Sequence, residues 1–171
     1  PHCHGWEVRD EALAVVGFRD CLELGVARAL LVREWSEDVV LCTDGAKLSA
    51  DDRARLKGRR VPVLSRPVDR LDHNESRLRS VVFDDGSELA RRAVFVPFRQ
   101  HQHTGIAARA GCATVASGAA VDAIATDWTG VTSVPGIWAA GTTTNPALLA
   151  IGSAGHGSFV ATQLHANLMS R

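Results

Sequence analysis

The residues best suited to covalent chemistry are a thiol and an imidazole side by side, Cys3 and His4. A thiolate is the nucleophile of thiol–disulfide exchange, and an imidazole titrates near neutral pH, so it can carry the proton that a thiol releases. A second cysteine one residue before Pro1 would complete a Cys-x-x-Cys-His motif, whose two thiols can close a small disulfide ring. An accidental pair, or half of a weak metal site, accounts for these two residues equally well.

A second group of candidate residues lies toward the other end of the sequence. Residues 132–141 read as a buried strand that stops at a glycine, and residues 149–168 have helical spacing with small residues at the start. Small side chains let a ligand approach the backbone, and the positive end of a helix suits a phosphate or a flavin edge. Tight packing of the helix on a sheet explains the same glycines without any ligand.

The elements that must position these residues follow from the apolar pattern. Residues 12–16, 38–42 and 61–64 are predicted strands. Helices are predicted between them, over residues 22–31 and 49–56, the second with Ser49 as its N-cap. Strand, helix and strand in this order predict a parallel sheet. Residues 68–96 alternate in a pattern that predicts a β-meander inserted in the α/β frame, with turns at 73–76 and 84–86, and residues 93–96 close that frame.

Composition bounds the class of protein. The 171 residues are 46% hydrophobic, enough for a real core, and 19 basic and 19 acidic residues leave no net charge. No broad field would attract nucleic acid or an anionic membrane, and no apolar run reaches the length of a bilayer span. We therefore expect a cytoplasmic protein that binds neither. The widely spaced Cys21, Cys42 and Cys112 are predicted to be buried apolar residues.

Together these segments resemble the thioredoxin reductase-like flavoproteins, within the pyridine nucleotide-disulfide oxidoreductases. Residues 132–141 match that family's Thr-Ser-x-Pro-Gly-x-x-Ala-Ala-Gly motif, and residues 151–157 resemble its small-residue helix. The resemblance implies an α/β fold in which residues 1–98 form a Rossmann-like NAD(P)-binding domain with a β-meander, the redox motif lying at its start. Residues 99–171, beginning with a polar linker at 99–103, would be the C-terminal half of an FAD-binding domain, without its N-terminal half.

The resemblance also implies the cofactor-binding residues. FAD would contact the glycine that ends the 132–141 motif, its neighbour, and the start of the last helix; Gly17 would belong to the glycine-rich nucleotide turn. The implied FAD residues are Gly141, Thr142, Leu149, Ala150 and Ile151. Within the nucleotide turn, Arg19 replaces the second glycine and Leu22 replaces a small residue, which obstructs the approach of a pyrophosphate. NADPH binding is therefore doubtful, whereas FAD is expected.

One subgroup of the family suits these departures, the flavin-dependent dithiol oxidases, which pass electrons to oxygen. By this resemblance Cys3 would be the thiol nearer the flavin and His4 the acid-base group. The substrate would be a dithiol or disulfide, either a small molecule or a thioredoxin-like protein, and the enzyme a homodimer. An NADPH-dependent reductase and a non-catalytic binding module of the same fold remain alternatives. Little activity is expected from this chain alone, which would need the N-terminal FAD half or a partner chain.

Overall fold

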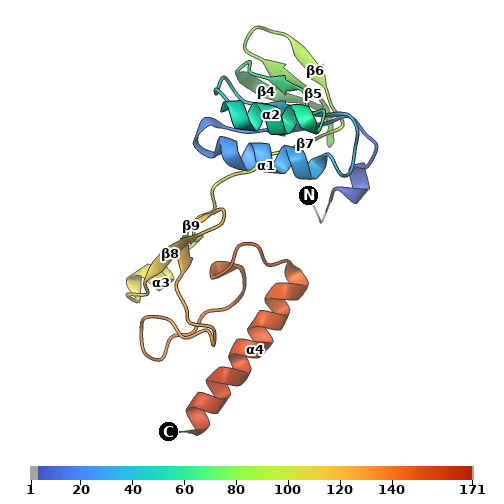
Figure 1. The fold of residues 1–171 in the computed structure, drawn as a ribbon. Helices are drawn as coiled ribbons and strands as arrows, with labels where there is room; N and C mark the ends of the chain where they lie inside the picture. The colour runs from blue at the N-terminus through green and yellow to red at the C-terminus, as the bar shows by residue number, and fades with distance from the viewer. Residues whose placement is uncertain (1–3, 171) are drawn as a thin grey trace. The chain divides into compact units, whose positions relative to one another are not determined.

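The computed structural model describes residues 4–170, which form two compact units (Figure 1). The boundary falls between Phe98 and Arg99. Unit 1 precedes this boundary and unit 2 follows it, and each is described by itself. No helix among residues 4–170 combines the length and apolar character needed to span a membrane.

Unit 1 contains the predicted parallel sheet. Its four strands are β1 (Leu13–Val16), β2 (Val39–Cys42), β3 (Val63–Leu64) and β7 (Ala93–Phe95). They lie in the order β3-β2-β1-β7, and every neighbouring pair is parallel. The connections run through α1 (Leu22–Val32) and α2 (Ala50–Gly58), whose N-cap Ser49 accepts a 3.0 Å hydrogen bond from the backbone N–H of Asp52. The expected α/β architecture is confirmed.

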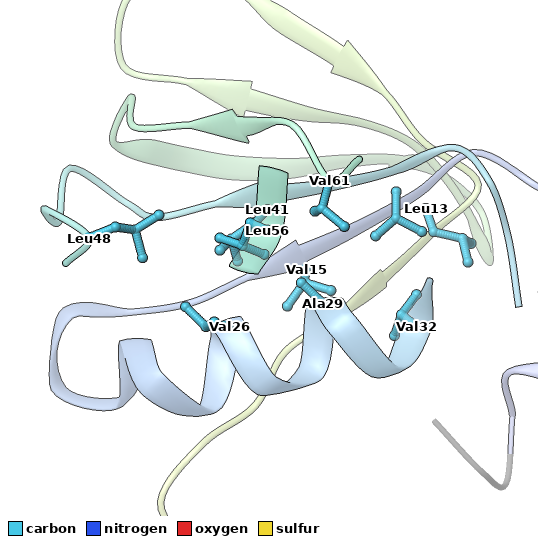
Figure 2. Close-up of a cluster of buried hydrophobic side chains, with 10 residues drawn as sticks. Leu13, Val15, Val26, Ala29, Val32, Leu41, Leu48, Leu56 and Val61 are labelled. Atoms are coloured by element: carbon cyan, nitrogen blue, oxygen red, sulfur yellow. The ribbon is translucent and has the colours of Figure 1, made fainter. Parts of the chain in front are cut away.

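Successive side chains along a strand point to opposite faces of the sheet, and each face of this sheet is covered by different elements. Leu13, Val15 and Leu41 face the helices, where they pack with Val26 and Leu56 (Figure 2). The intervening residues of β1 and β2 pack against the predicted meander, so all of these residues are buried. The meander comprises β4 (Val68–Asn74), β5 (Arg77–Phe83) and β6 (Glu88–Ala90). Unit 1 is thus a layer of helices, a parallel sheet and an antiparallel sheet.

The three cysteines predicted to be buried are buried and unpaired: Cys21, Cys42 and Cys112. Desolvation raises the pKa of Cys42 to about 11, although Arg91 and Arg66 oppose the shift. Burial, with a smaller contribution from Asp20, also raises the pKa of Cys21. Neither thiol is suited to form a reactive thiolate near neutral pH.

Unit 2 has little regular sheet. Its elements are α3 (Ile106–Arg109), the hairpin of β8 (Thr114–Ser117) and β9 (Ala120–Ile124), the 3₁₀ turn η3 (Gly141–Thr143), and α4 (Ala150–Met169). The polar segment 99–103 does not run free as a linker. The backbone of Gln100 pairs beside β9, and the N–H of Gln102 donates to Asp122 Oδ1 at 2.9 Å. This segment is therefore part of unit 2.

The prediction of a buried strand over residues 132–141 is wrong. The N–H of Ile137 donates to the carbonyl of Val134 at 3.1 Å, and Gly136 has φ 84°, so the chain turns at Pro135 and Gly136. Proline followed by glycine with positive φ is the preferred pair at the centre of a type II turn. Turn chemistry at these two positions outweighs the β-branched and apolar residues around them, which suggested a strand.

Candidate functional site

The thiol segment is described from His4 onward, so Cys3 lies outside the described residues. The imidazole of His4 is exposed, with Nδ1 3.2 Å from Glu7 Oε2. Glu7 lies in a short 3₁₀ turn, η1 (Trp6–Val8). The Trp6 ring is 61% exposed and carries the Arg9 guanidinium 4.1 Å above its centroid. The structure therefore gives His4 a carboxylate partner, which can orient the ring.

The residues that follow β1 fill the space beside the turn at Gly17. Residues Arg19–Cys21 form a 3₁₀ turn, η2, in which the N–H of Cys21 donates to the carbonyl of Phe18. Leu22 begins α1, and its Cδ1 atom lies 3.2 Å from the point that a Cβ on Gly17 would occupy. Helix α1 then passes so close to β1 that a Cβ on Gly25 would stand 2.7 Å from Gly17 Cα. Gly17 therefore serves close packing of the helix on the strand.

This closure bears on nucleotide binding. A dinucleotide fold binds pyrophosphate where glycines expose the backbone at the start of the first helix. Here Leu22 packs against Gly17, which is itself buried, so the backbone that a pyrophosphate would contact is not exposed. A hollow of about 340 Å³ remains beside the turn, and it has two cationic side chains. It is lined by Arg19, Leu22, Gly45, Ala46 and Lys47.

In unit 2 the glycine-ended loop meets the start of α4, as the sequence suggested. Gly141 has φ 80°, a conformation that favours glycine, and its N–H donates to His156 Nδ1 at 3.2 Å. A Cβ on Gly141 would lie 3.8 Å from Cβ of Ser153. The Oγ atom of Ser153 is buried and has no hydrogen-bond partner within residues 4–170. Because such an atom is costly to leave unsatisfied, this hydroxyl suits a polar ligand atom.

The first turn of α4 is also open. Its N-cap is Leu149, whose side chain cannot accept a hydrogen bond and is 50% exposed. Ile151 is 83% exposed, and Ala150 and Thr142 are exposed as well. The amides at the start of a helix have no acceptor within it, so a carbonyl or anionic oxygen could bind here.

The structure thus gathers five of the predicted residues and separates the others. Gly141 and Thr142 lie in η3, which contacts α4, and Leu149, Ala150 and Ile151 surround the start of that helix. Gly17 belongs to unit 1. Within the described part of the chain, no cluster of three or more His, Cys, Asp or Glu residues could hold a metal ion.

Three further residues were not predicted: Gln102, Ser153 and His156. Gln102 Nε2 donates to the carbonyl of Thr143 at 2.9 Å, while Thr143 Oγ1 donates to Gln102 Oε1 at 2.6 Å. These bonds tie η3 to the segment at residue 102. Ser153 and His156 carried a signal, since they are polar residues three apart in a small-residue helix and so share one face. No sequence pattern pointed to Gln102, because its partner Thr143 lies 41 residues away.

The chain is similar to several solved structures. No family model matches the chain, and no curated protein matches it. The chain matches the crystal structure of HlmI with TM-score 0.85 and 41% identity, over 99% of this chain and 52% of that one. It matches a protein from Bacillus anthracis that carries the name thioredoxin reductase TrxB with TM-score 0.85 and 25% identity, over 99% and 55%.

A third match, thioredoxin reductase from Streptococcus pyogenes, has TM-score 0.80 and 20% identity, over 98% of this chain and 56% of that one. At this identity the likeness concerns the fold alone. The chain spans about half the length of each of these three proteins. Its α/β architecture is therefore that of about half of a thioredoxin reductase-like oxidoreductase.

Proposed function

We propose that this chain is part of an FAD-dependent dithiol or disulfide oxidoreductase that does not draw its electrons from NADPH. The observation that carries this choice is the position of Leu22, whose Cδ1 lies 3.2 Å from the Cβ position of Gly17. A nicotinamide-dependent enzyme needs that backbone exposed for its pyrophosphate. The match to the Bacillus anthracis protein named thioredoxin reductase TrxB, at 25% identity over 99% of the chain, supports the oxidoreductase class.

FAD fits the residues around the start of α4. Ser153 Oγ is a buried hydroxyl without a partner, the first amides of α4 are open, and Gly141 leaves room beside them. Thr142, Leu149, Ala150 and Ile151 would complete the edge of this site. When bound, FAD would accept an electron pair from a thiol pair. The part of unit 2 present here would hold one edge of the cofactor, so the chain alone would have little activity.

The thiol chemistry would fall to the segment before β1. Oxidation of a substrate dithiol to a disulfide releases two electrons and two protons, the electrons passing through FAD to oxygen. Cys3 would exchange with the substrate through a second cysteine. His4, whose Nδ1 lies 3.2 Å from the Glu7 carboxylate, would accept a proton from a thiol, with the carboxylate orienting the ring. We also expect the complete enzyme to be a homodimer.

One observation supports an alternative function, that of an NADPH-dependent reductase. The hollow of about 340 Å³ beside the closed turn contains Arg19 and Lys47, two cations that could hold a phosphate. An NADPH-dependent reductase with an altered nucleotide turn would use it. A non-catalytic module of the same fold would bind neither FAD nor NADPH.

The test uses a protein that also supplies the other half of the fold, purified with its flavin. A small dithiol should bleach the flavin absorbance without air, and oxygen should restore it, whereas millimolar NADPH should leave it unchanged. Rapid bleaching by NADPH would establish the reductase instead. Absence of any flavin after reconstitution would favour the non-catalytic module.

Two variants test the thiol segment in the same protein. Cys3→Ser should abolish turnover with the flavin still bound, whereas Cys112→Ala, at a buried thiol of unit 2, should retain it. His4→Ala should slow proton transfer by about 10² to 10⁴-fold. His73→Ala is the matched control, since His73 is an exposed histidine of the meander. Full turnover in Cys3→Ser would contradict the thiol mechanism.

A further inference from the structure

A second feature of unit 1 lies away from the thiol segment and the nucleotide turn, between α2 and the edge strand β3. A hollow of about 410 Å³ opens there. Its floor is apolar, since Leu56 and Val61 are buried and Pro62 and Val63 continue the surface outward. Its rim consists of three cationic side chains. They are Arg53, Lys57 and Arg60.

These three cations differ from the two other cations of the 53–60 segment in having no counter-ion within the described residues. Arg55 pairs with Asp52 at 3.1 Å, and Arg59 pairs with Glu34. No ion pair or side-chain hydrogen bond joins the three rim cations to any other described residue, and no acidic side chain lines the hollow. Arg53 and Lys57 stand four residues apart in one helix, where like charges repel each other. The hollow is therefore a local positive site on a chain whose net charge is zero.

The third cation is held at a conformational cost. Arg60 has φ 55°, a region in which glycine is the usual residue just beyond a helix. Its N–H donates to the carbonyl of Lys57 at 3.0 Å and so closes the end of α2. Glycine would adopt this backbone conformation at lower cost than arginine, so the conformation does not explain why the residue is an arginine. Basic residues also favour the C-terminal end of a helix, but that preference does not account for the apolar floor beneath them.

The backbone beside the hollow is open as well. β3 is the outermost strand in the order β3-β2-β1-β7. The carbonyls of Pro62 and Leu64 accept from β2, from Leu41 and Thr43, each at 2.9 Å. Residues alternate in direction along a strand, so the N–H and C=O of Val63 point away from the sheet. An edge strand with unpaired backbone groups can pair with an added strand.

We propose that the hollow and the edge of β3 together bind an acidic, extended segment of a partner protein. Its backbone would pair with Val63, its apolar side chains would rest on the floor, and its carboxylates would meet Arg53, Lys57 and Arg60. Strand addition of this kind takes affinity from the main chain and specificity from alternate side chains. A nucleic acid could use the cations but neither the apolar floor nor the backbone edge.

The test uses the 171-residue chain and a fluorescently labelled peptide of alternating glutamate and valine, followed by fluorescence anisotropy. Arg53→Glu with Lys57→Glu should weaken binding at least about tenfold, because it places carboxylates opposite the carboxylates of the peptide, and like charges facing each other across an interface are strongly unfavourable. Arg55→Glu with Arg59→Glu is the matched control. It changes the net charge of the chain equally, at cations of α2 and its C-cap that do not line the hollow, and should weaken binding less than about threefold. Circular dichroism would show that both variants fold.

A second arm tests the strand edge without changing the protein. The same peptide with its backbone nitrogens methylated keeps its charges but cannot donate hydrogen bonds, so it should bind at least about tenfold more weakly. Equal weakening by the two double variants would overturn the site, as would equal binding of the methylated peptide. Tighter binding of a DNA oligonucleotide, or wild-type affinity for the peptide weaker than about 1 mM, would overturn it too.

Discussion

The close approach of α1 to β1 makes a sharp prediction about Gly25. In Gly25→Ala the new Cβ would stand 2.7 Å from Gly17 Cα and 3.5 Å from Gly17 N. Both obstacles are backbone atoms of a buried segment, so they cannot move aside as the end of a side chain would. The substitution must push α1 away from the sheet or distort the end of β1.

The expected cost follows from two opposing effects. Overpacking of a core costs about 1–3 kcal/mol, while replacing glycine by alanine within a helix gains about 1 kcal/mol. Because the obstacle is backbone, we expect a value near the upper end of the first range and a net loss of about 1–2 kcal/mol. For a unit of this size, the melting temperature should fall by roughly 4–16 °C.

Gly58→Ala is the matched control, because Gly58 also lies in a helix of unit 1 but a Cβ there would meet no atom within 4 Å. It should leave the melting temperature unchanged or raise it. Thermal unfolding of the whole chain, followed by circular dichroism, compares both variants with the wild type. If Gly25→Ala melts no lower than the wild type, α1 does not rest on Gly17.

Three further predictions concern the thiols and the candidate flavin site. Burial raises the pKa of Cys42 to about 11, so the folded thiol keeps a proton that the unfolded one loses near pH 9. The contribution of Cys42 to stability should therefore be level below pH 9 and fall by about 2 kcal/mol by pH 11, and Cys42→Val should flatten most of this decline in urea titrations. An identical decline in the variant would refute the assignment. Thr142→Asp, in a protein with both halves of the FAD domain, should tighten FAD binding roughly tenfold, because a charged acceptor forms the stronger hydrogen bond; unchanged affinity would remove Thr142 from the site. His156→Ala removes the acceptor for the N–H of Gly141 and should weaken FAD about fivefold, whereas His156→Asn should recover part of the loss. Equal affinities in these two variants would show that the hydrogen bond is immaterial.

Most of unit 1 could be predicted from the sequence, because each of its elements has a strong local signal. The buried strands β1 and β2 are short apolar runs, Ser49 caps α2, and Asp84-Asp85-Gly86 marks a turn of the meander. The obstruction at Leu22 was also predictable, since it depends on side-chain size at a position counted from Gly17. The identity of each unit's ligand stays a prediction, as does the role of Cys3.

Unit 2 was harder to predict, because its structure depends on contacts between distant residues. The hairpin at 114–124 consists mostly of small residues without a clear alternation. The 132–141 segment has strand-forming residues, but it turns at Pro135 and Gly136. The partnership of Gly141 with His156 spans 15 residues, and no local pattern announces it. Ser153 and His156 could have been found only by placing the glycine loop against one face of α4.

The exposure of α4 has a consequence for how the isolated chain will behave. The helix runs for 20 residues, of which Val160 alone is buried, while Ile151 and Met169 are more than 70% exposed. A helix with so little tertiary packing opens locally at small cost, so its amides exchange hydrogen quickly and its backbone enters a protease readily. Limited proteolysis should therefore shorten unit 2 from α4 and spare the layered core of unit 1. Any segment that covers α4 would then protect the chain from degradation, whatever else it contributes.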